Sequence, residues 1–177
     1  MKILFKLFIA LVLLLVVGSF FIPNTYEIQR TVHIKKPAIM VFLHVGGLEN
    51  WPAWNPWQQR DPGYKVTLGE KTSGVGASQT WESKHGGGEL TFTWTNPGKG
   101  VEFDYRYRGD WETKSAFRLQ QQQDGTMVTW ILKGKIDKPV IGSYMAAFQD
   151  EMTGGMLSYG LKLLKQTVEA DDREVVN

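Results

Sequence analysis

The fold is easiest to infer from residues 113–136, which read TKSAFRLQQQQDGTMVTWILKGKI. Apolar and polar side chains alternate on both sides of Asp124-Gly125, and this dipeptide is typical of tight hairpin turns. We therefore predict two antiparallel strands, Thr113–Gln122 and Thr126–Ile136.

Four further strand-like runs precede this hairpin. The connections between the runs supply the turn residues and positive φ angles that hairpins require. These connections are Gly74-Val75-Gly76, Gly86-Gly87-Gly88, Asn96-Pro97-Gly98 and Gly109-Asp110. The spacing of the runs indicates an antiparallel meander. The runs are Tyr64–Leu68, Ala77–Glu82, Glu89–Thr95 and Val101–Tyr107.

The chain upstream of the meander contributes one more strand and short helices. Residues Tyr26 to Ile34 alternate with period two, which predicts a half-buried strand. Pro37 then opens a short apolar-faced helix over Ala38–Val45. Residues 48–57 hold three Trp and two Pro, so we expect a short helix or tight loop that caps one end of the sheet.

The chain downstream of the meander is predicted to be helical as far as Ala170, with a flexible tail over residues 171–177. Gly154-Gly155 interrupts the apolar stripe of this helix, and two glycines inside a helix cost about 2 kcal/mol relative to alanine. We therefore predict a joint there, between a short lid helix from Val140 to about Met152 and the main C-terminal helix. The result is one α+β domain over residues 24–170, with helices on one face of the sheet.

The first 23 residues form a separate N-terminal segment. Lys2 and Lys6 precede an apolar run that ends at Ile22. Counted from Ile3 the segment has about 20 residues, which at about 1.5 Å per residue just spans a hydrocarbon core of ~30 Å. Because both lysines precede the run, we predict a single-pass membrane anchor with a cytoplasmic N-terminus and the domain on the outer, periplasmic or extracellular, side.

A cleaved signal peptide is the alternative for this segment. Residues 17–19, Val-Gly-Ser, are small enough to offer a processing site. Cleavage there would leave Phe20, Phe21 and Ile22 as a strongly apolar new N-terminus, which favours the uncleaved anchor.

Composition narrows the range of functions. The 177-residue chain has no Cys, which excludes thiol catalysis, thiolate metal sites and disulfides. With 20 Lys and Arg against 18 Asp and Glu, the net charge is +2 and no basic stripe is present, so nucleic acid is not a favoured partner. Seven Trp, nine Phe and six Tyr are enough aromatic residues to line a cavity.

Several segments carry a family resemblance. Residues 51–57, WPAWNPW, resemble the segment found after a strand and a Pro-led helix in the polyketide cyclase/dehydrase and lipid-transport family. Residues 74–78, GVGAS, followed by Trp81, are similar to a second segment of that family, and the order of elements agrees from about Pro23 to Glu169. The family belongs to the SRPBCC, START-like helix-grip superfamily. The resemblance implies a curved seven-stranded antiparallel sheet around a long C-terminal helix with a ligand cavity between them, and members with one N-terminal membrane segment are familiar.

Strand alternation places most aromatic rings on one face of the sheet and the charged side chains of the strands on the other. A methionine-rich part of the C-terminal helix would oppose the aromatic face, since Met adapts to irregular spaces. Simple core packing is the alternative for all of these side chains, and Trp51, Trp54 and Trp57 are interpreted as structural anchors. The candidate ligand-binding residues are Trp81, Phe92, Trp94, Phe103, Tyr105, Phe117, Trp130, Met145, Phe148, Met152 and Met156.

Catalytic chemistry finds little support in the sequence. Glu82, Glu102 and Asp104 have the opposite parity from the aromatic face, so no general acid or base is predicted in the pocket. The three His residues, 33, 44 and 85, do not share the spacing of metal ligands, and no glycine-rich loop opens a helix to hold a phosphate. We therefore predict no catalytic residue, metal or cofactor, and Tyr105 is the one polar side chain expected to point inward.

Three functions compete on this evidence. The leading hypothesis is membrane-anchored binding or carriage of a hydrophobic molecule, lipid-like or polycyclic. The alternatives are a cyclase or dehydratase that uses the same pocket as a template, and a regulatory or structural membrane-tethered module that binds an unknown protein partner.

Overall fold

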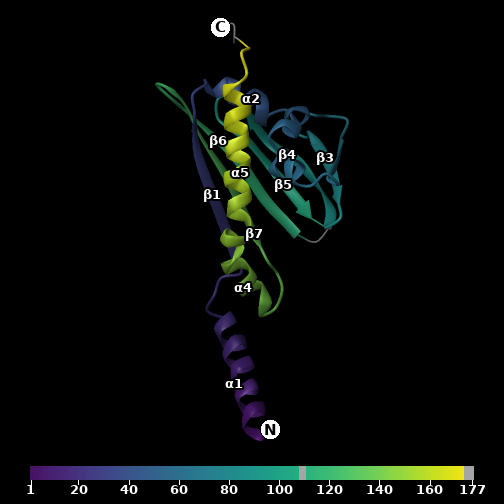
Figure 1. The fold of residues 1–177 in the computed structure, drawn as a ribbon, viewed down its shortest axis with the longest axis vertical. Coiled ribbons are helices and arrows are strands. Elements are labelled where there is room, and N and C mark those ends of the chain that lie inside the picture. The colour runs from purple at the N-terminus through teal and green to yellow at the C-terminus, as the bar shows by residue number, and fades with distance from the viewer. Residues whose placement is uncertain (108–110, 174–177) are drawn as a thin grey trace.

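A single antiparallel sheet forms the framework of the domain. The computed structural model describes residues 1–107 and 111–173, and within them seven strands follow the order β1-β7-β6-β5-β4-β3-β2 (Figure 1). The predicted meander is confirmed, because successive strands from β2 to β7 pair with one another and β1 closes against β7. The predicted turn at Gly109-Asp110 lies outside the described residues. The strands are β1 (Thr25–Ile34), β2 (Lys65–Leu68), β3 (Ser78–Ser83), β4 (Gly86–Asn96), β5 (Gly100–Tyr107), β6 (Trp111–Gln122) and β7 (Gly125–Lys135).

The hairpin between β6 and β7 forms where the sequence predicts it. Gln122 pairs with Gly125 across the turn, and Gly125 has a φ of 148°, a conformation that only glycine adopts readily. A side chain at this position would also collide with the backbone of Ile34. The turn therefore ties the end of β1 to the hairpin as well as reversing the chain.

The sheet has two ends that differ in how they are filled. Strand β1 starts at Thr25, close to the N-terminal helix α1 (Lys2–Ser19), and finishes at Ile34, close to α2 (Ala38–Val45). We call these the α1 end and the α2 end of the sheet. The antiparallel register then places the other strands: β7, β5 and β3 finish at the α1 end, whereas β6 and β4 start there.

Tryptophans of the short segment after α2 fill the space at the α2 end. This segment consists of the 3-10 helix η1 (Leu48–Ala53) and of α3 (Pro56–Arg60). Trp51 and Trp54 are buried, and their indole nitrogens each donate a hydrogen bond of 3.1 Å to a carbonyl oxygen near the end of α2. Trp54 also meets Phe117 and Trp130 edge to face. The expected cap at one end of the sheet is thus present, and its rings form part of the core.

The long helix α5 (Gln149–Glu169) lies across the sheet and packs mainly on β1, after the short helix α4 (Ile141–Ala147) (Figure 1). The prediction of a joint at Gly154-Gly155 is wrong, because α5 runs through both glycines and the break between the two helices falls at Phe148. Gly154 is buried where α5 crosses β1, and an added methyl group would collide with the guanidinium of Arg30. Close packing against Arg30 therefore explains why residue 154 is glycine, although alanine has the higher helix propensity.

The two glycines are expected to differ sharply when each is replaced by alanine. Gly155→Ala should raise the free energy of unfolding by about 1 kcal/mol, because no atom lies within 4 Å of the new methyl group and alanine favours the helix. Gly154→Ala should raise the free energy of unfolding by less, because the new methyl group displaces Arg30 from its ion pair with Asp150 (2.7 Å). Urea denaturation of the detergent-solubilised chain measures both, and equal stabilisation by the two variants would contradict this packing argument.

Helix α1 projects away from the sheet as a separate rod (Figure 1). It is long and apolar enough to cross a membrane, and its span is not buried in the domain. Its last turn is tied to α4: the Tyr144 hydroxyl donates to the carbonyl oxygen of Leu15 (2.7 Å), and the Ser143 hydroxyl donates to that of Ser19 (3.1 Å). The domain is therefore attached to the end of α1 through α4 as well as through the chain itself.

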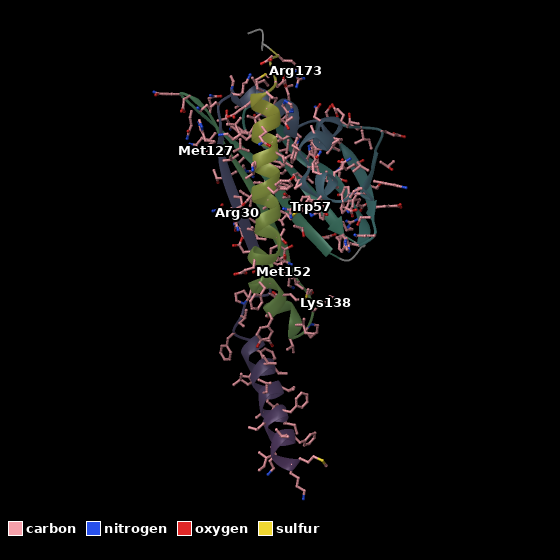
Figure 2. The ribbon with its side chains drawn as sticks, viewed as in Figure 1. Arg30, Trp57, Met127, Lys138, Met152 and Arg173 are labelled. Atoms are coloured by element: carbon pink, nitrogen blue, oxygen red, sulfur yellow. The ribbon has the colours of Figure 1, made fainter. Side chains whose placement is uncertain are left out.

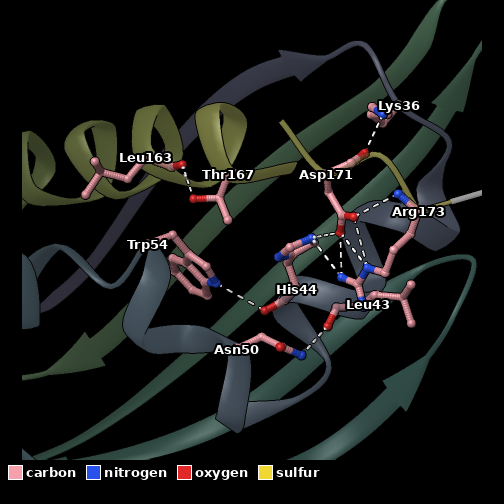
Figure 3. Close-up of polar contacts among 9 residues, drawn as sticks. All are labelled: Lys36, Leu43, His44, Asn50, Trp54, Leu163, Thr167, Asp171 and Arg173. Atoms are coloured by element: carbon pink, nitrogen blue, oxygen red, sulfur yellow. Dashed lines mark hydrogen bonds and ion pairs between the residues drawn. The ribbon is translucent and has the colours of Figure 1, made fainter. Parts of the chain in front are cut away.

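A cluster of polar side chains joins residues 171–173 to α2 (Figure 3). His44 is buried, and its Nε2 lies 2.8 Å from the Asp171 carboxylate, which also accepts hydrogen bonds from Arg173. The Asp171 carbonyl oxygen accepts a hydrogen bond from Lys36. The hydrogen bonds from Arg173 hold the pKa of Asp171 well below its usual range. Asp171 and Arg173, the start of the predicted tail, thus contact the domain, and residues 174–177 lie outside the described part.

Candidate ligand cavity

A cavity of about 300 Å³ lies between the sheet and the start of α5, at the α1 end. Trp51, one of the tryptophans that fill the α2 end, borders the cavity, whereas Trp54 does not line it. The two walls of the cavity, the sheet and the start of α5, come from segments far apart in the sequence. The lining residues are Tyr26, Trp51, Asn55, Trp57, Tyr64, Gln79, Leu90, Phe103, Tyr105, Tyr107, Thr113, Ser115, Trp130, Leu132, Gln149, Met152 and Thr153.

Stacked aromatic rings build one wall of the cavity. Trp81 of β3 stacks on Tyr105 of β5, with ring centroids 4.4 Å apart, and the ring of Tyr64 is nearly parallel to Trp81, with centroids 6.4 Å apart. Strand pairing brings Trp81 opposite Gly88 of β4, and a side chain there would occupy the position of the indole. The third glycine of the 86–88 run therefore makes room for this stack.

Burial keeps the phenols of this wall neutral. Desolvation raises the pKa of Tyr105 and that of Tyr64 far above their ordinary values, because a phenolate would lose its hydration there. Neither hydroxyl is hydrogen bonded to another described residue. Both are therefore available to donate a hydrogen bond to a bound molecule at any physiological pH.

The remaining polar groups of the cavity differ in how well they are satisfied. Tyr26 and Thr113 share a hydrogen bond of 3.0 Å, and Ser115 accepts one of 3.0 Å from the Trp130 indole. Gln79 is only 3% exposed, and its Oε1 has no hydrogen-bond partner among the described residues. A buried amide oxygen without a partner is costly, so Gln79 is the place where a ligand group would be stabilised most.

No charged side chain lines the cavity in the part of the chain that the structure describes. The ion pairs of the strands lie on the other face, where Arg106 contacts Glu89 and Glu112, and Arg118 contacts Glu102. Within the described residues, no group of three or more His, Asp and Glu side chains could hold a metal ion. The site thus offers shape, apolar surface and neutral hydrogen-bonding groups.

Ten of the eleven predicted site residues fall into four groups. Phe103, Tyr105, Trp130 and Met152 line the cavity. Trp81 and Met156 line a neighbouring hollow of about 470 Å³, which shares Trp57, Tyr64, Tyr105 and Tyr107 with the cavity. Phe92 and Phe117 are buried in the packed core, and Met145 and Phe148 line neither space.

The prediction that Trp94 lies on the aromatic face of the sheet is wrong, because it lies on the opposite face. The register of β4 against β5 shifts between Phe92 and Trp94, so strand alternation is interrupted at a β-bulge. Trp94 pairs with Glu102, and the guanidinium of Arg118 lies over its ring at 5.6 Å. It therefore belongs to the charged face of the sheet.

The polar side chains of the cavity are absent from the predicted site, although strand parity places three of them on the aromatic face. Gln79 precedes Trp81 by two residues, and Thr113 and Ser115 share the parity of Phe117. Their polarity favours the outer face of a half-buried sheet, but their parity places them on the inner face. Trp51 and Trp57 also line the cavity besides serving as structural anchors.

The cavity opens to the surface beside the junction of α4 and α5. Met152 lines the cavity and is also 68% exposed, so it stands at the mouth. Figure 2 shows Met152 near α4, on the side of the domain from which α1 extends. The mouth consequently lies toward the α1 end.

A curved seven-stranded sheet around a long C-terminal helix, with an aromatic cavity between them, defines a helix-grip protein. The chain belongs to the polyketide cyclase/dehydrase and lipid-transport family, whose model matches residues 25–169. A comparison with curated proteins gives no significant match.

Solved structures share this fold at low sequence identity. A protein from Chromobacterium violaceum is 16% identical, with a TM-score of 0.61, and the match covers 84% of this chain and 99% of that one. A protein from Bacillus halodurans is 19% identical, with a TM-score of 0.58 over 81% of this chain and 96% of that one. The di-domain ARO/CYC StfQ from the steffimycin biosynthetic pathway is 8% identical, with a TM-score of 0.63 over 82% of this chain and 51% of that one. At these identities the likeness concerns the fold alone.

Proposed function

We propose that this protein binds a small, largely apolar molecule that carries at least one hydrogen-bonding group, and that it does so while anchored to a membrane. The single observation that carries the proposal is the cavity of about 300 Å³ with the unpartnered Oε1 of Gln79 in its lining. A packed core leaves neither a space of that size nor an unsatisfied amide.

The lining favours a planar or polycyclic ligand. Flat aromatic side chains such as Trp57 and Trp130 offer extended apolar contact, and the hydroxyls of Tyr64 and Tyr105 can donate to a carbonyl or hydroxyl oxygen. The volume is at the lower end of the range for ligand pockets, about 300–1,000 Å³, which argues against a lipid with two full acyl chains. A hydroxylated or carbonyl-bearing polycyclic molecule fits both the shape and the polarity.

The membrane part of the proposal follows from α1. Lys2 and Lys6 lie at its N-terminal end, so the positive-inside rule favours a cytoplasmic N-terminus and a domain on the outer side of the membrane. The cavity would then hold a molecule at the outer surface, and carriage or storage needs no charged catalytic group.

The test measures how tightly two probes that differ in one hydroxyl group, 2-naphthol and naphthalene, bind to the unaltered chain and to Gln79→Leu. The chain should bind 2-naphthol roughly 5–10-fold more tightly than naphthalene if a hydrogen bond of about 1–1.4 kcal/mol forms to Gln79. Gln79→Leu should abolish this preference and at the same time stabilise the empty protein by on the order of 1 kcal/mol, because it removes an unsatisfied buried amide. Fluorescence titration and urea denaturation measure the two effects.

Gln120→Leu is the matched control, since Gln120 is an exposed glutamine on β6. It should change neither the preference nor the stability by more than a few tenths of a kcal/mol. If neither 2-naphthol nor naphthalene binds the intact chain, the proposal is overturned. Conversion of a bound polycyclic ketide would favour the cyclase or dehydratase alternative.

A further inference from the structure

Exposed apolar side chains gather where α1, α4 and α5 meet. Phe20 and Phe21 after α1 are each 82% exposed, Ile141 and Phe148 at the two ends of α4 are each 61% exposed, and Met152 is 68% exposed. We call these five residues the junction patch. Large apolar side chains that cluster on a surface mark a place of contact with another apolar phase or molecule.

Hydrogen bonds set the position of this patch relative to α1. The Tyr144 hydroxyl of α4 reaches the carbonyl oxygen of Leu15, and Ser143 reaches that of Ser19. Leu15 lies about 6 Å below Ser19 along the helix axis, since each residue rises 1.5 Å. The first turn of α4 is thus held against the C-terminal end of α1, and the Tyr144 side chain reaches back along the last turn of α1 (Figure 1).

The length of α1 then determines the depth of α4. Its 18 residues extend about 27 Å, so the last turn of a spanning α1 lies at the boundary between the hydrocarbon core and the headgroups. Tyrosine is enriched at this boundary, where its ring is in an apolar layer and its hydroxyl finds a polar partner. Tyr144 has the polar partner, because its hydroxyl donates to the carbonyl oxygen of Leu15.

We propose that the junction patch lies in the interfacial layer of the same bilayer that α1 spans, so that the mouth of the cavity at Met152 opens onto lipid. This inference rests on the proposed membrane anchoring. The ligand then passes between bilayer and cavity without crossing bulk water.

The charges around the patch indicate that the contact is mainly apolar. Asp137 is paired with Lys135 (3.4 Å) and Asp150 with Arg30 (2.7 Å), so neither carboxylate is left to repel a membrane. Lys138 lies beside α4 in Figure 2 and is exposed. Glu151, next to Met152, is also exposed and has the opposite charge. One lysine and one glutamate give little net attraction for anionic lipid, so the contact should form on neutral phosphatidylcholine and persist at high salt.

The absence of cysteine from the chain allows the test to be made with single labels. The full chain is reconstituted into phosphatidylcholine vesicles, with an environment-sensitive fluorophore on Phe148→Cys or Ile141→Cys and a quencher attached to the lipid acyl chains near the headgroup. Val12→Cys within α1 reports whether the anchor is inserted. Val75→Cys is the matched control, because Val75 is an exposed apolar residue in a loop tied to the α2 end by the bridge between Gly47 and Ser73.

The inference predicts blue-shifted emission and loss of fluorescence for the labels at 148 and 141, and neither effect for the label at 75. If the Val12 label is quenched and the labels at 148 and 141 behave like the one at 75, the anchor is inserted but the patch does not touch the bilayer. The inference about the patch is then rejected, and the membrane anchoring stands. If the Val12 label is not quenched, the anchoring fails and the inference falls with it. A patch that is protected from soluble quencher but not reached by the lipid quencher contacts protein, which also overturns the inference.

Discussion

Trp54→Ala is expected to lower the free energy of unfolding by about 3–5 kcal/mol, a large part of the total stability of an ordinary domain. The indole is fully buried and contacts Phe117 and Trp130 edge to face. Its removal also leaves the His44 carbonyl oxygen without the hydrogen bond that it accepts from Trp54. Urea denaturation of the full chain in detergent should therefore show a much lower midpoint.

Trp57→Ala is the matched control for this prediction. Trp57 is half-buried and lines the cavity, so less packing is lost on truncation and the unfolding free energy should fall by clearly less than for Trp54. Ligand binding should change more for Trp57 than for Trp54. Equal losses of stability for both variants would mean that the α2 end is no better packed than the cavity wall.

Two acidic substitutions in α1, Val12→Asp with Leu13→Asp, are expected to prevent membrane insertion. Aspartate near the centre of a spanning helix costs about 2.5–3.5 kcal/mol per residue, so the pair costs about 5–7 kcal/mol. The unaltered chain should remain in the membrane fraction after carbonate washing, whereas the variant should be recovered in the soluble fraction. Membrane fractionation followed by immunodetection measures the distribution.

Leu68→Asp with Val75→Asp is the corresponding control, because both residues are exposed apolar side chains of the domain. This variant should stay in the membrane fraction. Soluble mature protein that begins at Phe20 in the unaltered chain would show that residues 1–19 are a cleaved signal peptide, and the anchor would be rejected.

The elements of the fold follow closely from local patterns. The hairpin predicted as Thr113–Gln122 and Thr126–Ile136 is observed as β6 and β7, with ends that differ by one or two residues. Alternation is a property of neighbouring residues, and a turn such as Asp124-Gly125 acts within four residues, so no distant contact is needed to predict either. The family resemblance then supplied the closure of the sheet around the C-terminal helix.

The two wrong predictions, for Trp94 and Gly154, concern places where the assembled structure departs from a local pattern. Trp94 changes face because one extra residue at a bulge reverses the parity of the strand beyond it. Gly154 lies within the continuous helix α5, where Arg30, more than a hundred residues away in the sequence, occupies the space that a side chain at residue 154 would need. Neither effect has a signal within its own segment.

The number and order of the strands, the long C-terminal helix and the apolar N-terminal helix can therefore be predicted from the sequence alone, because each depends on periodicity or composition within one segment. Which aromatic rings are packed in the core and which line a cavity depends on the assembled fold. Phe117 and Phe103 share a parity class, yet Phe117 is covered by Trp54 and Phe103 borders open space. Whether a ring is packed depends on which side chain from elsewhere in the chain occupies the volume beside it, and that volume exists only once sheet, tryptophans and helix are assembled.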